Sequence, residues 1–303
     1  MSRTKALISA VAFAAALATP AWTVPLALTG GDTSAESVAA GSSQAETSGH
    51  DDQAAGGHGE AGAARTGSTV VDAQTYNGMV PGPLMHVNVG DKVRIVVQNT
   101  LPESTVVHWH GLPVPNSMDG VADVTQDPIK PGESFTYSFT ATRESVGWYH
   151  SHHNGTKQVG DGLFGTFLIG DVPVPRGVEV AQEIPMVLQD ADAIGLSLNG
   201  KSFPATEPIR ARKGEWLKLH YFNAGTQAHP MHLHGLDQLV IAKDGFPLPQ
   251  PYKADTVLVA PGERYTVLIK ADQPGTWAFH CHIFPHSEGA QGMFGMFTEL
   301  IVT

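Results

Sequence analysis

The segment from His280 to Met296, HCHIFPHSEGAQGMFGM, contains the only cysteine of the 303-residue chain. In an extended strand, alternate side chains lie on opposite faces, so the thiol of Cys281 points away from the face that His280 and His282 share. Thiolates and imidazoles are ligands for soft and borderline metal ions. The spacing therefore predicts two metal sites that are joined through a single strand.

The chain contains three more His-X-His pairs, which read HWH, HSH and HLH. Each pair in a strand directs two imidazoles, roughly 7 Å apart along the backbone, to one face. The histidines of a single pair are more often buried and hydrogen-bonded in a protein core than bound to a metal. The four pairs together supply eight imidazoles, which is more than one metal ion can use. Imidazole suits Cu, Zn, Fe and Ni, so the pairs predict a metal cluster without naming the metal. The predicted ligands are His108, His110, His150, His152, His232, His234, His280 and His282.

The four pairs belong to an internal repeat. HWHG recurs as HLHG 124 residues later, and HSH recurs as HCH 130 residues later. Short β-branched and aromatic runs, such as KVRIVVQN and RYTVLIKA, alternate with glycine and proline turns through both halves. We therefore expect an all-β chain with two sandwich domains of about 100 residues each. Their expected bounds are 68–172 and 183–303, with a linker at 173–182.

Cys281 has imidazoles available for a site of its own. His286 follows it by five residues, and HPMHLH adds His229 three residues before a His-X-His pair. Two imidazoles, one thiolate and a weak axial methionine form the blue-copper arrangement, in which the thiolate favours copper. A zinc site would instead close with four strong tetrahedral ligands. The segment therefore predicts a blue copper site.

The internal repeat restricts this site to the second half of the chain. In the register of the repeat, Cys281 corresponds to Ser151 and Met293 to Leu163, so the first half lacks the thiolate. The same register selects Met293 as the axial ligand, and Met296 is the alternative.

Three further histidines of the two predicted domains are left outside the predicted sites. His86 and His220 each lie alone in strand-like runs, where a buried and hydrogen-bonded role is the commoner one. His153 extends one pair, but its counterpart in the repeat is Ile283, so it is not expected to bind metal.

The N-terminal segment has the pattern of a Sec-type signal peptide. Arg3 and Lys5 precede an apolar run that ends at a proline, and no twin arginine is present. We expect the signal peptide to cover residues 1–28, with an uncleaved anchor as the alternative. Residues 29–67 are rich in Gly, Ala, Ser and acids, which predicts a disordered linker. The protein is therefore expected to be secreted or periplasmic.

The formal net charge of −11 and the single cysteine restrict the partners further. An acidic chain is a poor partner for nucleic acid. One cysteine cannot form an intrachain disulfide, and a free thiol is a liability in an oxidising compartment unless a metal occupies it. The composition is that of an exported protein that carries metal cations and does not bind nucleic acid.

The motifs together resemble the four copper-binding signatures of the multicopper oxidases, which here read HWHG, HSHH, HPMHLHG and HCHIFPH. The resemblance runs from about residue 70 to residue 303 and is strongest to the small two-domain laccase-like group, whose blue copper lies in the second domain. It implies two cupredoxin-like Greek-key β-sandwiches in tandem, with one type 1, one type 2 and two type 3 copper ions per chain. By this resemblance the type 1 ligands are His229, Cys281, His286 and Met293, the type 2 ligands are His108 and His232, and the type 3 ligands are His110, His150 and His282 for one ion and His152, His234 and His280 for the other.

The resemblance also implies an activity. A laccase-like enzyme takes single electrons from a small-molecule reductant, such as a phenol, and reduces O₂ to water with four of them. Cys281 would carry electrons through its own backbone to the flanking histidines, and Asp119 would act in proton relay instead of serving only as a turn residue. Members of the group form homotrimers with the three-copper cluster at a domain interface, although the sequence leaves open whether one chain or two complete it.

Other activities remain as alternatives at this stage. Copper nitrite reductase has two similar domains, but its blue copper is typically in the first, and it lacks the histidines that flank Cys281 here. A ferroxidase or cuprous oxidase would share all the predicted ligands. A blue-copper electron carrier would leave the eight paired histidines without a role.

Overall fold

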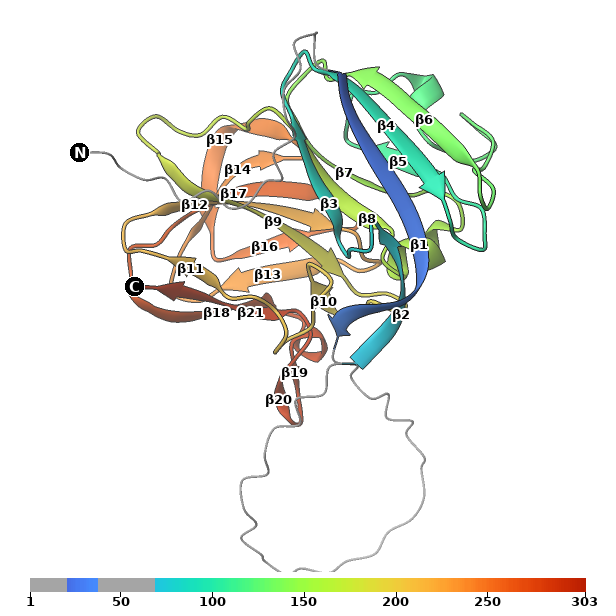
Figure 1. Cartoon of the computed structure of the whole chain (residues 1–303). Coiled ribbons are helices and arrows are strands. Elements are labelled where there is room, and N and C mark those ends of the chain that lie inside the picture. Colours follow the sequence, from blue (N-terminus) through green and yellow to red (C-terminus); the bar gives the residue numbers. More distant parts are fainter. Residues whose placement is uncertain (1–20, 38–68) are drawn as a thin grey trace, which may run out of the picture.

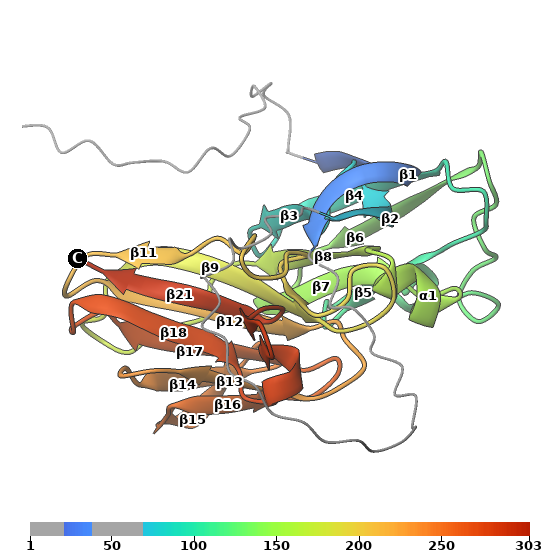
Figure 2. The same cartoon turned by 90° about the horizontal axis from the view of Figure 1, so that it is seen from below.

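The computed structural model describes residues 21–37 and 69–303. Two β-sandwiches lie side by side, one from each half of the chain (Figures 1 and 2). This confirms the prediction of an all-β chain. Among the described residues, no helix has the length and apolar character that a membrane crossing requires.

The first sandwich packs the sheet β2-β1-β4-β6 against the sheet β3-β8-β7-β5. Its strands are β1 (Ala21–Ser37), β2 (Thr69–Tyr76), β3 (Gly82–Val87), β4 (Lys92–Asn99), β5 (Val107–His110), β6 (Ser134–Thr140), β7 (Ser145–Ser151) and β8 (Phe164–Ile169). A short 3-10 turn, η1 (Asn116–Met118), follows β5, and the six-residue helix α1 (Gly155–Gly160) follows β7.

The second sandwich packs the sheet β10-β9-β12-β17-β14-β15 against the sheet β11-β21-β18-β13-β16. Its strands are β9 (Val180–Gln189), β10 (Ser197–Leu198), β11 (Ile209–Ala211), β12 (Trp216–Asn223), β13 (His229–Leu233), β14 (Gln238–Lys243), β15 (Phe246–Ala254), β16 (Thr256–Val259), β17 (Arg264–Lys270), β18 (Gly275–Cys281) and β21 (Phe297–Val302). Between β18 and β21 lie the 3-10 turn η2 (Phe284–His286) and the hairpin β19 (Glu288–Gly289) and β20 (Gly292–Met293), which projects from the sandwich (Figure 1).

The N-terminal part of the first sandwich differs from the sequence prediction. Residues 21–37 form β1, which pairs in parallel with β4 and antiparallel with β2. Leu26 and Leu28 are 1% and 0% exposed because alternate side chains of this strand face the core. The signal peptide predicted for 1–28 and the linker predicted to begin at 29 both overlap this strand, and their common boundary stays a prediction. The remainder of both predictions lies outside the described residues.

The two sandwiches pack against each other through an apolar cluster that joins residues from both halves. Trp148 and Phe164 of the first half lie in this cluster with Phe222 and Leu268 of the second. Arg264 of β17 crosses the same boundary, since its Nε donates to the carbonyl of Val146 at 3.1 Å. The buried apolar contacts and this hydrogen bond hold the halves in one arrangement.

Candidate metal centres

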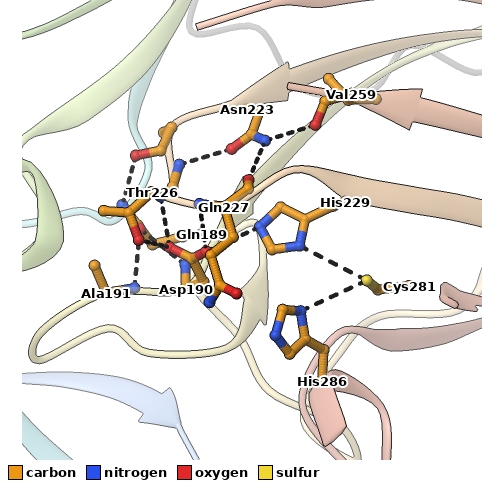
Figure 3. Close-up of polar contacts among 12 residues, drawn as sticks. Gln189, Asp190, Ala191, Asn223, Thr226, Gln227, His229, Val259, Cys281 and His286 are labelled. Atoms are coloured by element: carbon orange, nitrogen blue, oxygen red, sulfur yellow. Dashed lines mark hydrogen bonds and ion pairs between the residues drawn. The ribbon is translucent and has the colours of Figure 1, made fainter. Parts of the chain in front are cut away.

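The three residues predicted to surround the thiolate meet in the second sandwich. His229 begins β13, Cys281 ends the neighbouring β18, and His286 lies in η2 (Figure 3). The Nδ1 atoms of both histidines lie 3.7 Å from Cys281 Sγ, and all three ligand atoms lie within 4.8 Å of one another. His229 and Cys281 are fully buried, and His286 is 7% exposed. The donor set and its spacing fit one copper ion without a rearrangement of the strands.

Burial also affects the protonation of this group. It raises the pKa of the Cys281 thiol to about 11 and lowers the pKa of His286. The thiol is therefore protonated and the His286 imidazole neutral at neutral pH. A metal ion that binds here must displace the thiol proton, so binding releases protons.

The first group of paired histidines lies across two neighbouring strands of the first sandwich. β5 and β7 are antiparallel, and His108 is directly opposite His150. His108, His110 and His150 offer nitrogen atoms within 4.8 Å of one another, and the His152 ring centre lies 5.4 Å from that of His108. We refer to these four residues as the first quartet. The Nε2 atom of His150 is buried and has no hydrogen-bond partner in the described part of the chain, as expected of a nitrogen that binds a metal ion.

The second group lies at the corresponding position in the second sandwich. β13 and β18 are antiparallel, and His232 is directly opposite His280. The Nε2 atoms of His234 and His280 are 3.1 Å apart, and the ring centres of His232 and His282 are 5.3 Å apart. We refer to His232, His234, His280 and His282 as the second quartet. His234 and His282 are exposed, so this quartet opens toward solvent.

Hydrogen bonds select the ring nitrogen that each quartet offers. In four of the eight rings, Nδ1 lies at hydrogen-bond distance from an oxygen acceptor, which leaves the Nε2 lone pair free. The contacts are His108 with the carbonyl of Asp119 at 2.8 Å, His150 with that of Ser151 at 2.8 Å, His280 with that of Cys281 at 3.0 Å, and His232 with the hydroxyl of Thr256 at 2.9 Å. The site around the thiol uses the opposite choice, since there the Nδ1 atoms face the sulfur.

Burial favours the neutral, metal-binding form of several imidazoles of the quartets. It lowers the pKa of His150 far below its ordinary value. For His110, burial together with the positive charge of Arg264 lowers the pKa to about 3. Burial also lowers the pKa of His234 and His280, and neighbouring imidazoles add to the effect. Neutral imidazoles are ready to coordinate a cation at neutral pH.

The two quartets do not meet within one chain. Among the described residues, the ring contacts and candidate ligand groups all join histidines of the same sandwich. The first quartet instead faces the loop before β17, where a Cβ atom on Gly262 would lie 3.2 Å from the His110 ring. A cavity of about 380 Å³ beside His150 and His152 extends to Thr226 of the second sandwich. The eight predicted ligands thus form two separate groups, one in each sandwich.

Asp119 lies directly after η1, beside the first quartet. Its carboxylate Oδ1 is 3.5 Å from Nδ1 of His108, and its side chain is 33% exposed. Its carbonyl makes the shorter contact, at 2.8 Å. Gly120 permits this approach, because its φ is +78° and a Cβ atom there would lie 1.7 Å from the carbonyl oxygen of Val107.

The two candidate axial methionines have different environments. Met293 ends β20 in the projecting hairpin and is 42% exposed. Met296 is 0% exposed and belongs to the same core cluster as Cys281, whose N–H donates to the Met296 carbonyl at 3.0 Å. The register of the repeat favours Met293, whereas burial favours Met296.

Sequence reasoning missed the groups that orient the predicted ligands. Asp190 lies 3.3 Å from Nε2 of His229, and Ser287 Oγ donates to the Cys281 carbonyl at 2.8 Å. Neither residue lies in a motif that marks a metal ligand. His220, left outside the predicted sites, contacts Glu183 at 2.8 Å and Thr266 at 2.9 Å in a polar cluster of the second sandwich.

Comparisons with known proteins show similarity in sequence and in fold to copper-containing oxidases. Two family models, each described as multicopper oxidase, match residues 59–173 and 176–301. The chain is 39% identical to the solved multicopper oxidase mgLAC, with a TM-score of 0.71 over 77% of this chain and 80% of that one. It is 35% identical to the blue copper oxidase from Nitrosomonas europaea, with a TM-score of 0.73 over 78% and 81%. Laccase-2 of Botryotinia fuckeliana is 31% identical over 73% of this chain, which spans only 45% of that protein.

Paired substitutions decide between the two methionines. We expect Met293→Leu to raise the reduction potential of copper bound at Cys281, because the axial ligand tunes that potential. Each tenfold change in the preference for the cupric form corresponds to about 59 mV. Met296→Leu is expected to leave the potential unchanged and to cost less than about 1.5 kcal/mol of stability, as a volume-conserving core change. Redox titration of the visible band measures both; a shift in Met296→Leu alone would assign the axial position to Met296.

Proposed function

The chain belongs to the multicopper oxidase family, and from this premise we propose that it is a laccase-like enzyme that couples oxidation of phenolic or similar donors to reduction of O₂ to water. Membership makes it an oxidoreductase that uses copper, a reductant and O₂. The laccase-like specificity is our proposal, since the chain spans 45% of Laccase-2 and 40% of dihydrogeodin oxidase from Aspergillus terreus.

The observation that carries the proposal is that Cys281 joins the site around its thiol to the second quartet. Its thiol faces His229 and His286, while the flanking His280 and His282 belong to the second quartet. The Cys281 carbonyl also accepts a hydrogen bond from His280 Nδ1 at 3.0 Å. Two covalent routes and one hydrogen bond thus connect the thiol with the imidazoles of the quartet.

We propose four copper ions for each chain. Copper supplies one-electron redox chemistry, and four ions together match the four electrons that O₂ requires. The proposed type 1 ligands are His229, Cys281, His286 and Met293, and the type 2 and type 3 ligands are the two quartets. The lowered pKa of His110, His150 and His286 and the displaceable proton of the Cys281 thiol suit these roles.

A second copy of the chain is needed to complete the cluster. Each quartet supplies four imidazoles, and within one chain they lie in separate half-sites. The exposed second quartet of one subunit would face the first quartet of its neighbour. A homotrimer, the assembly implied by the resemblance, closes such head-to-tail contacts into a ring.

Residues 1–20 lie outside the described part of the chain, so export stays a prediction. The basic residues and apolar run there favour Sec-dependent export. A secreted or periplasmic location would suit an enzyme whose donor is a small molecule outside the cell.

Oxygen uptake by the copper-loaded protein tests the proposed activity. We expect uptake with a phenol, measured against Fe(II), Cu(I) and nitrite as alternative substrates. Cys281→Ser should lose the visible band and donor-driven uptake but retain three of four coppers, because the quartets are intact. Nitrite reduction without oxygen uptake would instead favour a nitrite reductase, and one copper per native chain would favour an electron carrier.

Asp119 is the proposed proton-relay residue, because its carboxylate lies beside the first quartet and is partly exposed to water. We expect Asp119→Asn to slow the reaction of the reduced enzyme with O₂ by about a hundredfold, within the usual range for acid–base groups. Anaerobic reduction by the donor should be unchanged. Asp127→Asn, which alters an exposed acid of the same loop region, is the matched control. Equal slowing of both half-reactions in stopped-flow experiments would remove Asp119 from this role.

A further inference from the structure

A buried carboxylate faces the imidazole of His229 on the side away from Cys281. Oδ2 of Asp190 lies 3.3 Å from Nε2 of His229, and both side chains are 0% exposed (Figure 3). Nε2 is buried and has no hydrogen-bond partner among the described residues, and the Asp190 carboxylate is the charged group that it faces. The opposite ring nitrogen, Nδ1, faces the thiol at 3.7 Å.

The carboxylate is held in place by main-chain groups of the loop that leads into β13. Oδ1 of Asp190 accepts hydrogen bonds from the Thr226 N–H at 2.7 Å and the Thr226 hydroxyl at 3.1 Å. Oδ2 accepts one from the Gln227 N–H at 2.8 Å. Gly225 makes room for this approach, since a Cβ atom there would lie 2.7 Å from Oδ1. Every one of these groups donates, so they favour an ionised acceptor at this position.

The backbone of Asp190 is fixed as well. The side-chain oxygen of Gln189 accepts the N–H groups of Asp190 at 2.9 Å and Ala191 at 3.1 Å. The amide nitrogen of Gln189 donates to the carbonyl of Ala224 at 3.2 Å, which ties the end of β9 to the same loop. A carboxylate restrained in this way keeps its direction toward His229 through changes elsewhere in the site.

From this geometry we propose that Asp190 is a positioning residue for the type 1 copper site. It holds the proton of His229 on Nε2 and thereby leaves Nδ1 as the metal-binding atom. Its negative charge also favours the cupric over the cuprous form, since a carboxylate beside a ligating imidazole increases the donor strength of that ligand. The inference rests on the proposed function only for the identity of the metal. It does not rest on it for the choice of Nδ1 as the metal-binding nitrogen of His229.

Asparagine is the informative replacement. It has the shape of aspartate but only one acceptor oxygen, whereas Asp190 receives two main-chain N–H groups and a hydroxyl and faces a ring N–H as well. In Asp190→Asn the side-chain NH₂ must therefore face either the main-chain N–H groups and hydroxyl of the loop or the ring N–H of His229, and two donors cannot form a hydrogen bond. Asp192→Asn is the matched control, because it removes the same charge from an exposed side chain two residues away.

The copper-loaded proteins give the first readout. We expect Asp190→Asn to bind copper at Cys281 at least tenfold more weakly, in the range known for outer groups of metal sites. Its reduction potential should rise, by about 59 mV for each tenfold change in cupric preference. In Asp190→Asn the copper content of the quartets should match that of the native protein. In Asp192→Asn both the copper affinity at Cys281 and the reduction potential should match the native values. A native potential and affinity in Asp190→Asn would overturn the proposal.

The copper-free native protein gives a second readout that does not depend on the variant folding or on any activity. Nitrogen NMR shifts of His229 should report a proton on Nε2 in the native protein. A native ring protonated at Nδ1 would overturn the proposal even if the enzyme were a laccase. If the native protein shows the expected tautomer but no visible band after copper loading, the proposed function is contradicted, whereas the positioning role of Asp190 toward His229 is retained.

Discussion

The opposed directions of neighbouring side chains in one extended strand determine how this protein is organised. At the end of β18, the thiol of Cys281 enters the buried core, whereas His280 and His282 belong to the second quartet on the opposite face of the strand. No turn or flexible segment separates the two sites, because the same three residues serve both. The elements around β18 complete the two sites. The neighbouring strand β13 supplies His229 to the site around the thiol and His232 to the second quartet, and η2 supplies His286 to the site around the thiol.

Hydrogen bonds then give identical side chains different chemistry. Backbone carbonyls and a hydroxyl face Nδ1 in the quartets, while a carboxylate faces Nε2 of His229. The first choice presents Nε2 to a cluster at the surface, and the second presents Nδ1 to a thiol in the core. Burial lowers the pKa of His150 and His280 and so favours their neutral, metal-binding form. The positions of glycines such as Gly120 and Gly225 follow from the close approach of these acceptors.

Much of the site could be predicted because strand alternation converts spacing into direction. Eight paired histidines and one cysteine were enough to define two kinds of site, and the structure brings His229, Cys281 and His286 together as expected. Sequence could not locate Asp190, because its contact with His229 joins the end of β9 to β13 and no local pattern marks it. It also missed β1, whose composition past residue 28 resembles a linker and whose pairing with β4 is a tertiary contact. Likewise, the separation of the quartets depends on how the sandwiches pack, which no motif encodes.

The central claim is that two half-sites in each chain become one cluster between copies, connected to the thiol through β18. It is tested most directly by mixing two inactive variants, His152→Ala in the first quartet and His282→Ala in the second. If neighbouring subunits complete the cluster, co-assembled variants contain some interfaces with both quartets intact, and about a quarter of the native oxygen uptake should return for random assembly. If one chain completes the cluster alone, every chain in the mixture is damaged, and the absence of any recovery in fully co-assembled protein would contradict the account.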